Sequence, residues 1–76
     1  MRQWIIRGRD TLGLTQEDLA QRAGITRQAI SSYETGTRGS KFGVPMLIAI
    51  AQALEMPMED ALQAEAEYLR DQEKTA

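Results

Sequence analysis

Residues 27–35 carry side chains suited to contacts with a nucleic-acid duplex. If they form a helix, with 100° between successive positions, Ile30 and Tyr33 point to one side and the polar residues to the other. The polar stripe has no carboxylate and consists of Arg27, Gln28, Ser31, Ser32 and Thr35. Glutamine suits adenine, arginine suits guanine, and serine and threonine suit either base or a phosphate. An ordinary solvated helix face, which is the alternative, usually carries Glu and Lys. The stripe therefore favours duplex binding.

The residue types that are missing exclude most catalytic chemistry. The 76-residue chain contains no His and no Cys, so it lacks the commonest general base, the usual zinc ligands and any thiol nucleophile or disulfide. A chain this short is one domain with a thin core. We expect no enzyme, no metal site and no cofactor. The longest apolar run, residues 46–51, is far shorter than the ~20 residues of a membrane span. We therefore expect a soluble, cytoplasmic protein with no membrane partner.

Charge is divided unevenly along the chain, although the net charge is only -2. Residues 1–41 hold seven basic and four acidic side chains and so carry +3, whereas residues 42–76 hold two basic and seven acidic side chains and carry -5. The cationic half suits a polyanion, and the acidic half should face away from it. Chance unevenness in a small protein is the alternative.

The chain shows no strand-like alternation, and its composition and periodicity predict an all-α protein of five helices. Thr15 and Asp18 have the spacing of a capping box at the start of the second helix, and Thr26 is expected to cap the third. Gly24 ends the second helix. The second and third helices are therefore joined by a very tight turn around Gly24. Such a turn holds two helices at a steep angle and leaves one outer face of the second of them, here the third helix of the chain, exposed.

The other three helices follow from similar signals. The first is expected over residues 2–11, with Gly13 as its stop, and residues 36–43 read as a loop. The fourth has Pro45 in its first turn and a predicted buried row of Val44, Leu47, Ile50, Ala51 and Leu54. The fifth begins near Pro57 and has an apolar row of Leu62, Ala66 and Leu69, with order expected to about Leu69 and fraying from about Asp71.

The run GLTQEDLAQRAGITRQAISSYETG, residues 13–36, resembles the helix-turn-helix of the lambda-repressor-like family, also called the xenobiotic-response-element type. Residues 47–54 and 58–62 resemble the family's fourth and fifth helices. The resemblance implies a five-helix DNA-binding domain over residues 1–62, with the helix-turn-helix at helices 2 and 3. Residues 63–76 lie outside it as a C-terminal helical extension with a frayed end. That extension either folds back on the first helix, near Trp4, or packs against a second subunit.

The resemblance also implies roles for particular positions. Gln16, first in the second helix, matches a residue that grips a DNA phosphate with help from the positive end of that helix. The recognition helix is expected to reach base edges from Arg27, Gln28, Ser31 and Ser32, and Thr26 at its start is included in the DNA-binding set. Backbone contacts are expected from Thr35, Arg38 and Lys41. Two alternatives stay open: Arg27 reaches a base or only a phosphate, and Lys41 binds a phosphate or only solvent.

Two features of the first helix concern the scaffold. Family members often pair an arginine at the position of Arg9 with the acid at the end of the recognition helix, here Glu34, so a partly buried structural ion pair is expected. Gly8 stands where relatives usually place a large apolar residue, and it weakens the helix by ~1 kcal/mol against Ala. We expect Trp4 or a residue of the last helix to fill the volume.

These observations predict a transcriptional regulator that binds double-stranded DNA. The resemblance favours a repressor that occupies a palindromic operator as a homodimer, in a bacterial or phage setting and associated with the nucleoid. The apolar residues expected outside the core, and so available for dimer contacts, are Phe42, Met46, Met58, Tyr68 and Leu69. The alternative function is an antitoxin-like interaction module that keeps the fold and binds a protein partner, which the acidic overall charge would suit.

Overall fold

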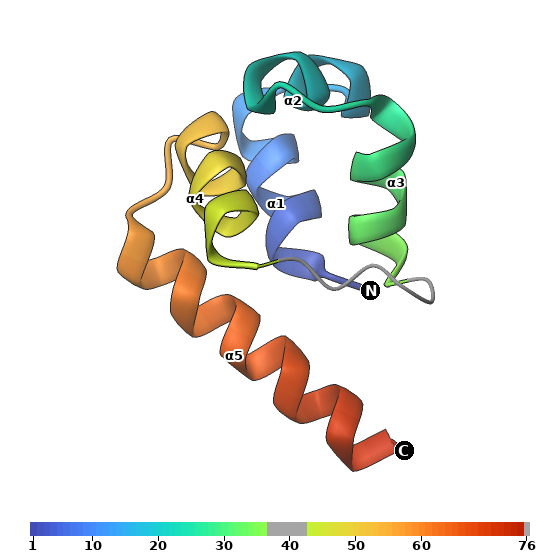
Figure 1. Ribbon diagram of the computed structural model, residues 1–76, viewed down its shortest axis with the longest axis vertical. Coiled ribbons are helices and arrows are strands. Elements are labelled where there is room, and N and C mark those ends of the chain that lie inside the picture. Colours follow the sequence, from blue (N-terminus) through green and yellow to red (C-terminus); the bar gives the residue numbers. More distant parts are fainter. Residues whose placement is uncertain (37–42, 76) are drawn as a thin grey trace.

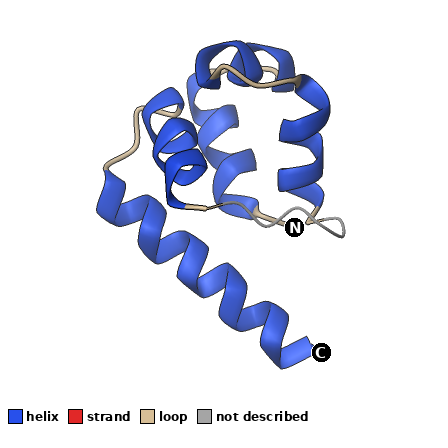
Figure 2. Ribbon diagram, in the orientation of Figure 1, coloured by secondary structure: helices blue, strands red, loops and turns tan. Residues whose placement is uncertain are grey.

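The computed structural model describes residues 1–36 and 43–75, with side chains described as far as residue 71. Within these residues the chain forms five helices and no strand (Figures 1 and 2). The helices are α1 (Gln3–Leu12), α2 (Gln16–Ala23), α3 (Arg27–Thr35), α4 (Val44–Ala53) and α5 (Met58–Thr75). The predicted all-α, five-helix fold is confirmed. None of the described helices is long and apolar enough to cross a membrane.

The predicted helix ends are present. Thr15 accepts a hydrogen bond from the Asp18 backbone N–H at 3.1 Å, and the Asp18 carboxylate accepts one from the Thr15 backbone N–H at 3.0 Å, which completes the capping box. Thr26 caps α3 by accepting from the backbone N–H of Ala29 at 3.1 Å. Gly24 ends α2 with a φ of 74°, a left-handed conformation that suits a residue without a β-carbon.

A single apolar core lies between the helices. Its fully or nearly buried members come from all five helices or their ends and are Trp4, Ile5, Leu19, Ala20, Ile30, Leu47, Ile50, Ala51, Ala53, Leu54 and Ala61. The predicted buried row of α4 is therefore right at four positions and wrong at Val44, which is 60% exposed. Val44 is the first residue of α4 and lies at the end of the helix, where the core no longer covers it.

Leu54 fills the volume beside Gly8. A β-carbon added to Gly8 would lie 3.0 Å from Leu54 Cδ1, so α1 and the residue that follows α4 approach closely. Trp4 and Ala64 of α5, which include the expected sources, line a groove together with Gly8, but the atoms nearest to Gly8 belong to Leu54. Leu54 follows α4 directly, and the end of that helix supplies the missing side chain.

The last helix, α5, folds back along α1 and α4, so its position agrees with the first of the two predicted alternatives. Its buried face carries Ala61 and Glu65, while Leu62 and Leu69 are 48% and 42% exposed. The predicted apolar row of α5 thus faces away from the core. Residue 62, the predicted end of the DNA-binding domain, lies inside α5, which continues past Leu69 to Thr75.

Candidate nucleic-acid interface

A three-residue turn, Gly24–Thr26, connects α2 to α3, and the two helices pack on each other. Ile25 donates its backbone N–H to the Ala20 carbonyl at 3.0 Å, which ties the turn to the preceding helix. On the inner side of α3, Ile30 is fully buried and Tyr33 is partly buried against the core. This packing fixes which face of α3 remains outside.

The outer face of α3 carries the polar side chains that the sequence singled out. Arg27, Gln28 and Thr35 are exposed, whereas Ser31 and Ser32 are half-buried. The Thr35 hydroxyl donates to the Ser31 carbonyl at 3.0 Å, one turn back, so its hydrogen is used within the helix. Thr26 is exposed, and its oxygen serves as the N-cap. Of the four residues expected to reach base edges, Arg27 and Gln28 are the exposed ones, and both lie in the first turn of α3.

The single carboxylate of α3 is removed from the outer face. Glu34 is 3% exposed, and Arg9 of α1, predicted to pair with it, binds its two oxygens at 2.8 and 3.3 Å. Arg9 also donates to the Leu14 carbonyl at 3.0 Å. The hydrogen bond to Glu34 raises the pKa of Arg9 above its ordinary value, so the ion pair keeps its positive partner. As a result, the exposed side of α3 presents Arg27 as its charge and no acid.

Gln16, at the start of α2, lies beside the same carboxylate. Its side-chain amide donates to Glu34 Oε1 at 2.9 Å, and the side chain is half-buried. An amide nitrogen carries two hydrogens, so one of them is used by Glu34 and the group is held in one orientation. Gln16 is the residue predicted to contact a phosphate, and its side chain is oriented by Glu34 of α3. It lies at the N-terminal end of α2, where a helix favours anions.

Two residues that the sequence did not single out join this region to the rest of the molecule. Arg2 is buried, and its guanidinium binds Glu65 of α5 and the Tyr33 carbonyl of α3. In the sequence, Arg2 is one of the seven basic residues of the cationic half, and nothing local marks it as buried. Glu65 shares a helical face with Ala61 and Tyr68, and a polar residue between a small and an aromatic one gives no signal to a search for apolar periodicity.

The remaining predicted contacts fall on the segment that the structure leaves out. Arg38 and Lys41, predicted to touch the DNA backbone, and Phe42, predicted to lie outside the core, belong to residues 37–42 and lie outside the described residues.

Three of the exposed acidic side chains lie away from α3. Glu55, Glu59 and Asp60 are exposed around the start of α5, which lies on the opposite side of the molecule from α3 in Figure 1. A duplex on the outer face of α3 would therefore be separated from this acidic end, in agreement with the division of charge along the sequence.

Comparison with known proteins gives two matches. Residues 5–60 match the model of a family described as helix-turn-helix. Over 56 residues the chain is 45% identical to an uncharacterised HTH-type transcriptional regulator of Methanothermobacter thermautotrophicus, and the aligned segment covers 71% of this chain and 75% of that protein. No solved structure matches the chain. The family match contains α2, the turn and α3 in full.

Proposed function

This chain belongs to the lambda-repressor-like helix-turn-helix family, and from that membership we propose that it is a repressor that binds a palindromic operator in double-stranded DNA as a homodimer. In this proposal α3 is the recognition helix and enters the major groove, while the start of α2 lies against the phosphate backbone. The observation that carries the proposal is the outer face of α3. It is polar and free of acid because Glu34 is buried against Arg9.

Within this proposal the predicted residues divide by the part of the duplex they touch. Gln28 reads a base from the first turn of α3, since its exposed amide can both donate to and accept from adenine. Ser31 and Ser32 lie closer to the core and reach base edges from the middle of α3, and Gln16 holds a phosphate. Thr35, Arg38 and Lys41 supply further backbone contacts, and for this Thr35 turns its hydroxyl from the Ser31 carbonyl to a phosphate oxygen. Arg27 serves a base or a phosphate.

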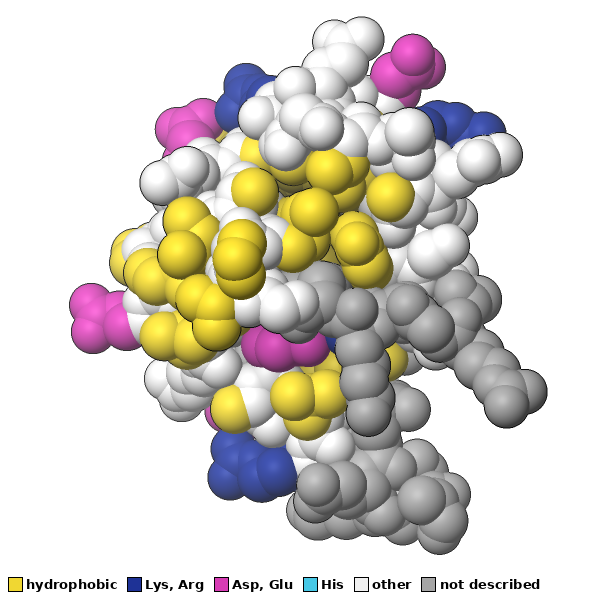
Figure 3. All heavy atoms as spheres, in the orientation of Figure 1, with side chains coloured by type: hydrophobic (Ala, Val, Ile, Leu, Met, Phe, Trp, Pro, Cys, Tyr) yellow, Lys and Arg dark blue, Asp and Glu magenta, His cyan; other side chains and the backbone are white. Residues whose placement is uncertain are grey.

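Exposed apolar side chains on α4 and α5 support assembly into a dimer. Hydrophobic groups gather on the face formed by α4 and the beginning of α5 (Figure 3). The large hydrophobic residues that remain exposed on these two helices are Val44, Ile48, Leu62 and Leu69. One recognition helix covers only a few base pairs, so a two-fold dimer with its recognition helices ~34 Å apart provides the specificity of an operator. Of the residues predicted for this role, Leu69 is exposed, whereas Met46 and Met58 pack partly against the core.

Selection of bound duplexes from a random pool tests this proposal most broadly. We expect a palindromic consensus whose half-sites lie about one duplex turn apart. Enrichment of duplexes without a consensus would contradict sequence-specific binding. A folded protein that enriches no duplex even at low salt would favour the second candidate, an antitoxin-like interaction module. The overall net charge of -2 and the exposed apolar face suit that candidate.

A further inference from the structure

The last turn of α3 is capped by a residue from the N-terminus of the chain. The final carbonyl groups of a helix have no partner within the helix. Here the Tyr33 carbonyl accepts from Arg2 Nη1 at 2.9 Å, and the Glu34 carbonyl accepts from the Arg2 backbone N–H at 2.8 Å. α3 has no basic residue in its own last turn. Arg2 therefore provides the positive charge that the C-terminal end of a helix favours.

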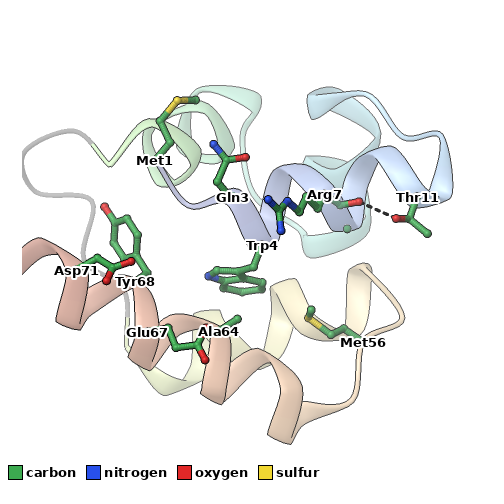
Figure 4. A pocket seen from close by; sticks show the side chains of 11 residues that line it. Met1, Gln3, Trp4, Arg7, Thr11, Met56, Ala64, Glu67, Tyr68 and Asp71 are labelled. Atoms are coloured by element: carbon green, nitrogen blue, oxygen red, sulfur yellow. Dashed lines mark hydrogen bonds between the residues drawn. The ribbon is translucent and has the colours of Figure 1, made fainter.

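Arg2 is in turn held by α5. Its guanidinium donates to both oxygens of Glu65, at 2.9 and 3.0 Å, and the arginine is only 1% exposed. Glu65 also accepts from the indole N–H of Trp4 at 3.1 Å. Figure 4 shows the Trp4 ring extending from α1 toward α5, in a groove of about 580 Å³ between the two helices. A planar, two-bond contact of this kind restricts the orientation of the guanidinium.

Tyr68, one turn after Glu65 on α5, touches the end of α3 as well. The Arg2 guanidinium carbon lies 4.5 Å from the centre of the Tyr68 ring, a cation–π contact. The Tyr68 hydroxyl lies so close to Gly36 that a β-carbon at that glycine would overlap it. Gly36 ends α3 with a φ of 74°. Thus α5 contacts the end of α3 both through Arg2 and directly.

We propose that Arg2, Glu65 and Tyr68 form a clamp that positions the C-terminal end of the recognition helix on DNA. The inference rests on the proposed function, since DNA binding is what gives α3 that role. All three clamp residues lie outside residues 5–60, the segment that matches the family. They are positioning residues: they act on DNA through the last two turns of α3, which carry Ser31, Ser32 and Thr35.

Substitution of Arg2 by lysine separates this role from simple charge pairing. Arg2→Lys keeps a positive charge beside Glu65 but loses the planar fork that binds Glu65 twice and still reaches the Tyr33 carbonyl. The matched control is Arg22→Lys, because Arg22 also joins a carboxylate, Glu55 at 3.2 Å, to the carbonyl of a helix end, Ala53 at 3.3 Å. Arg22 contacts the end of α4 and not the end of α3, so its substitution tests the same kind of contact at another helix. A milder second variant, Tyr68→Phe, removes only the hydroxyl group.

Two measurements on the full chain decide the proposal. The first is affinity for the duplex that the wild-type protein selects from a random pool, compared with a scrambled duplex. We expect Arg2→Lys to bind the selected duplex about tenfold more weakly and Tyr68→Phe about threefold, with unchanged binding to the scrambled duplex. The second is amide hydrogen exchange at residues 33–36 in the free protein, which should be faster in both variants. Arg22→Lys should change neither quantity.

The clamp is contradicted if both folded variants keep wild-type affinity and wild-type exchange, or if Arg22→Lys weakens operator binding equally. A fold that is only weakened would lower the binding of both duplexes together, through the fraction of folded protein. That result would also contradict a positioning role. If the wild-type protein itself selects no duplex, the proposed function fails, and this outcome differs from a loss confined to the clamp variants.

Discussion

Gln16 donates its side-chain amide to the carboxylate of Glu34 across 2.9 Å, so the first residue of α2 and the last turn of α3 are joined by one hydrogen bond. Arg9 binds the same carboxylate from α1. Three helices therefore meet at one buried acid. This arrangement fixes how α2 and α3 are presented together, and it removes the only negative charge of α3 from the face proposed to approach DNA.

Removal of Arg9 should destabilise the fold strongly. Arg9→Ala leaves the Glu34 carboxylate buried without its cation, and we expect a loss of about 3 kcal/mol in the free energy of unfolding. Urea unfolding followed by circular dichroism measures the loss. Arg22→Ala is the control, because its ion pair with Glu55 is exposed and should contribute less than ~1 kcal/mol. Equal losses in the two variants would contradict a buried role for Arg9.

The capping box at the start of α2 should make stability depend on pH in acid. The Asp18 carboxylate accepts the Thr15 backbone N–H, and this hydrogen bond lowers the pKa of Asp18 from its ordinary value of 3.8. The unfolded chain then binds more protons in this range than the folded one, so the contribution is present above pH 3.8 and is lost as pH falls through the lower pKa of the folded state.

Asp18→Asn tests this dependence. We expect the variant to melt below the wild type at neutral pH, and the gap between the two melting temperatures to close in acid. Thermal unfolding of both proteins from about pH 7 to about pH 2 measures the gap. A gap that stays constant over the whole range would show that the charge of Asp18 does not stabilise the cap.

Local sequence signals predicted the helix ends correctly. They could not predict polar contacts between residues far apart in the sequence. Thr15, Thr26 and Gly24 were placed correctly because a cap depends on residues within one turn. The pairing of Arg9 with Glu34 was expected only from the resemblance to a family. Arg2 and Glu65 are separated by 63 residues, and no local pattern joins them.

The same limit explains the error on α5. Apolar periodicity selected the row of Leu62 and Leu69, but α5 turns Glu65 inward because Arg2 and Trp4 both donate to it. The ion pair shares the inner face of α5 with the core residue Ala61 and the partly buried Ala64, and these small side chains give a weaker periodic signal than the exposed leucines. With this face turned inward, Leu62 and Leu69 remain exposed and are available for contacts in the proposed dimer.

A dimer that uses the exposed apolar face should be broken by one charge. Leu62→Glu is expected to shift the protein from dimer to monomer in sedimentation, because it places a carboxylate inside the interface. Leu62 is half-exposed in the single chain, so the free energy of unfolding of the monomer should change by less than about 0.5 kcal/mol. Gln63→Glu adds the same charge at an exposed neighbouring position and should leave the dimer intact. A monomeric wild type, free and on its selected operator, would contradict the dimer.

Operator binding should weaken with salt in proportion to the number of phosphates contacted. Each contact adds about -0.9 to the slope of log K against log salt. Arg38→Ala should therefore flatten the slope by about one unit per protomer, if Arg38 holds a phosphate. Arg70→Ala, on the exposed surface of α5, is the control and should leave the slope unchanged. Equal slopes for Arg38→Ala and the wild type would remove Arg38 from the interface.

The proposed roles of Gln28 and Gln16 differ in kind. Gln28 is exposed in the first turn of α3 and can pair with one adenine, whereas Gln16 is held by Glu34 and is proposed to hold a phosphate. Gln28→Ala should lose about 1 to 3 kcal/mol on the best operator and relax the base preference at one position of each half-site. Gln16→Ala should weaken binding to all sequences alike.

The most direct test of DNA reading by α3 is the base preference at every half-site position, measured by competitive binding of single-substitution operators to the wild type, Gln28→Ala and Gln16→Ala. Gln28→Ala should lose its preference at one position, while Gln16→Ala should keep the wild-type preferences with uniformly lower affinity. An unchanged preference profile for Gln28→Ala, together with an altered position for Gln16→Ala, would contradict the proposed docking of α3 in the major groove.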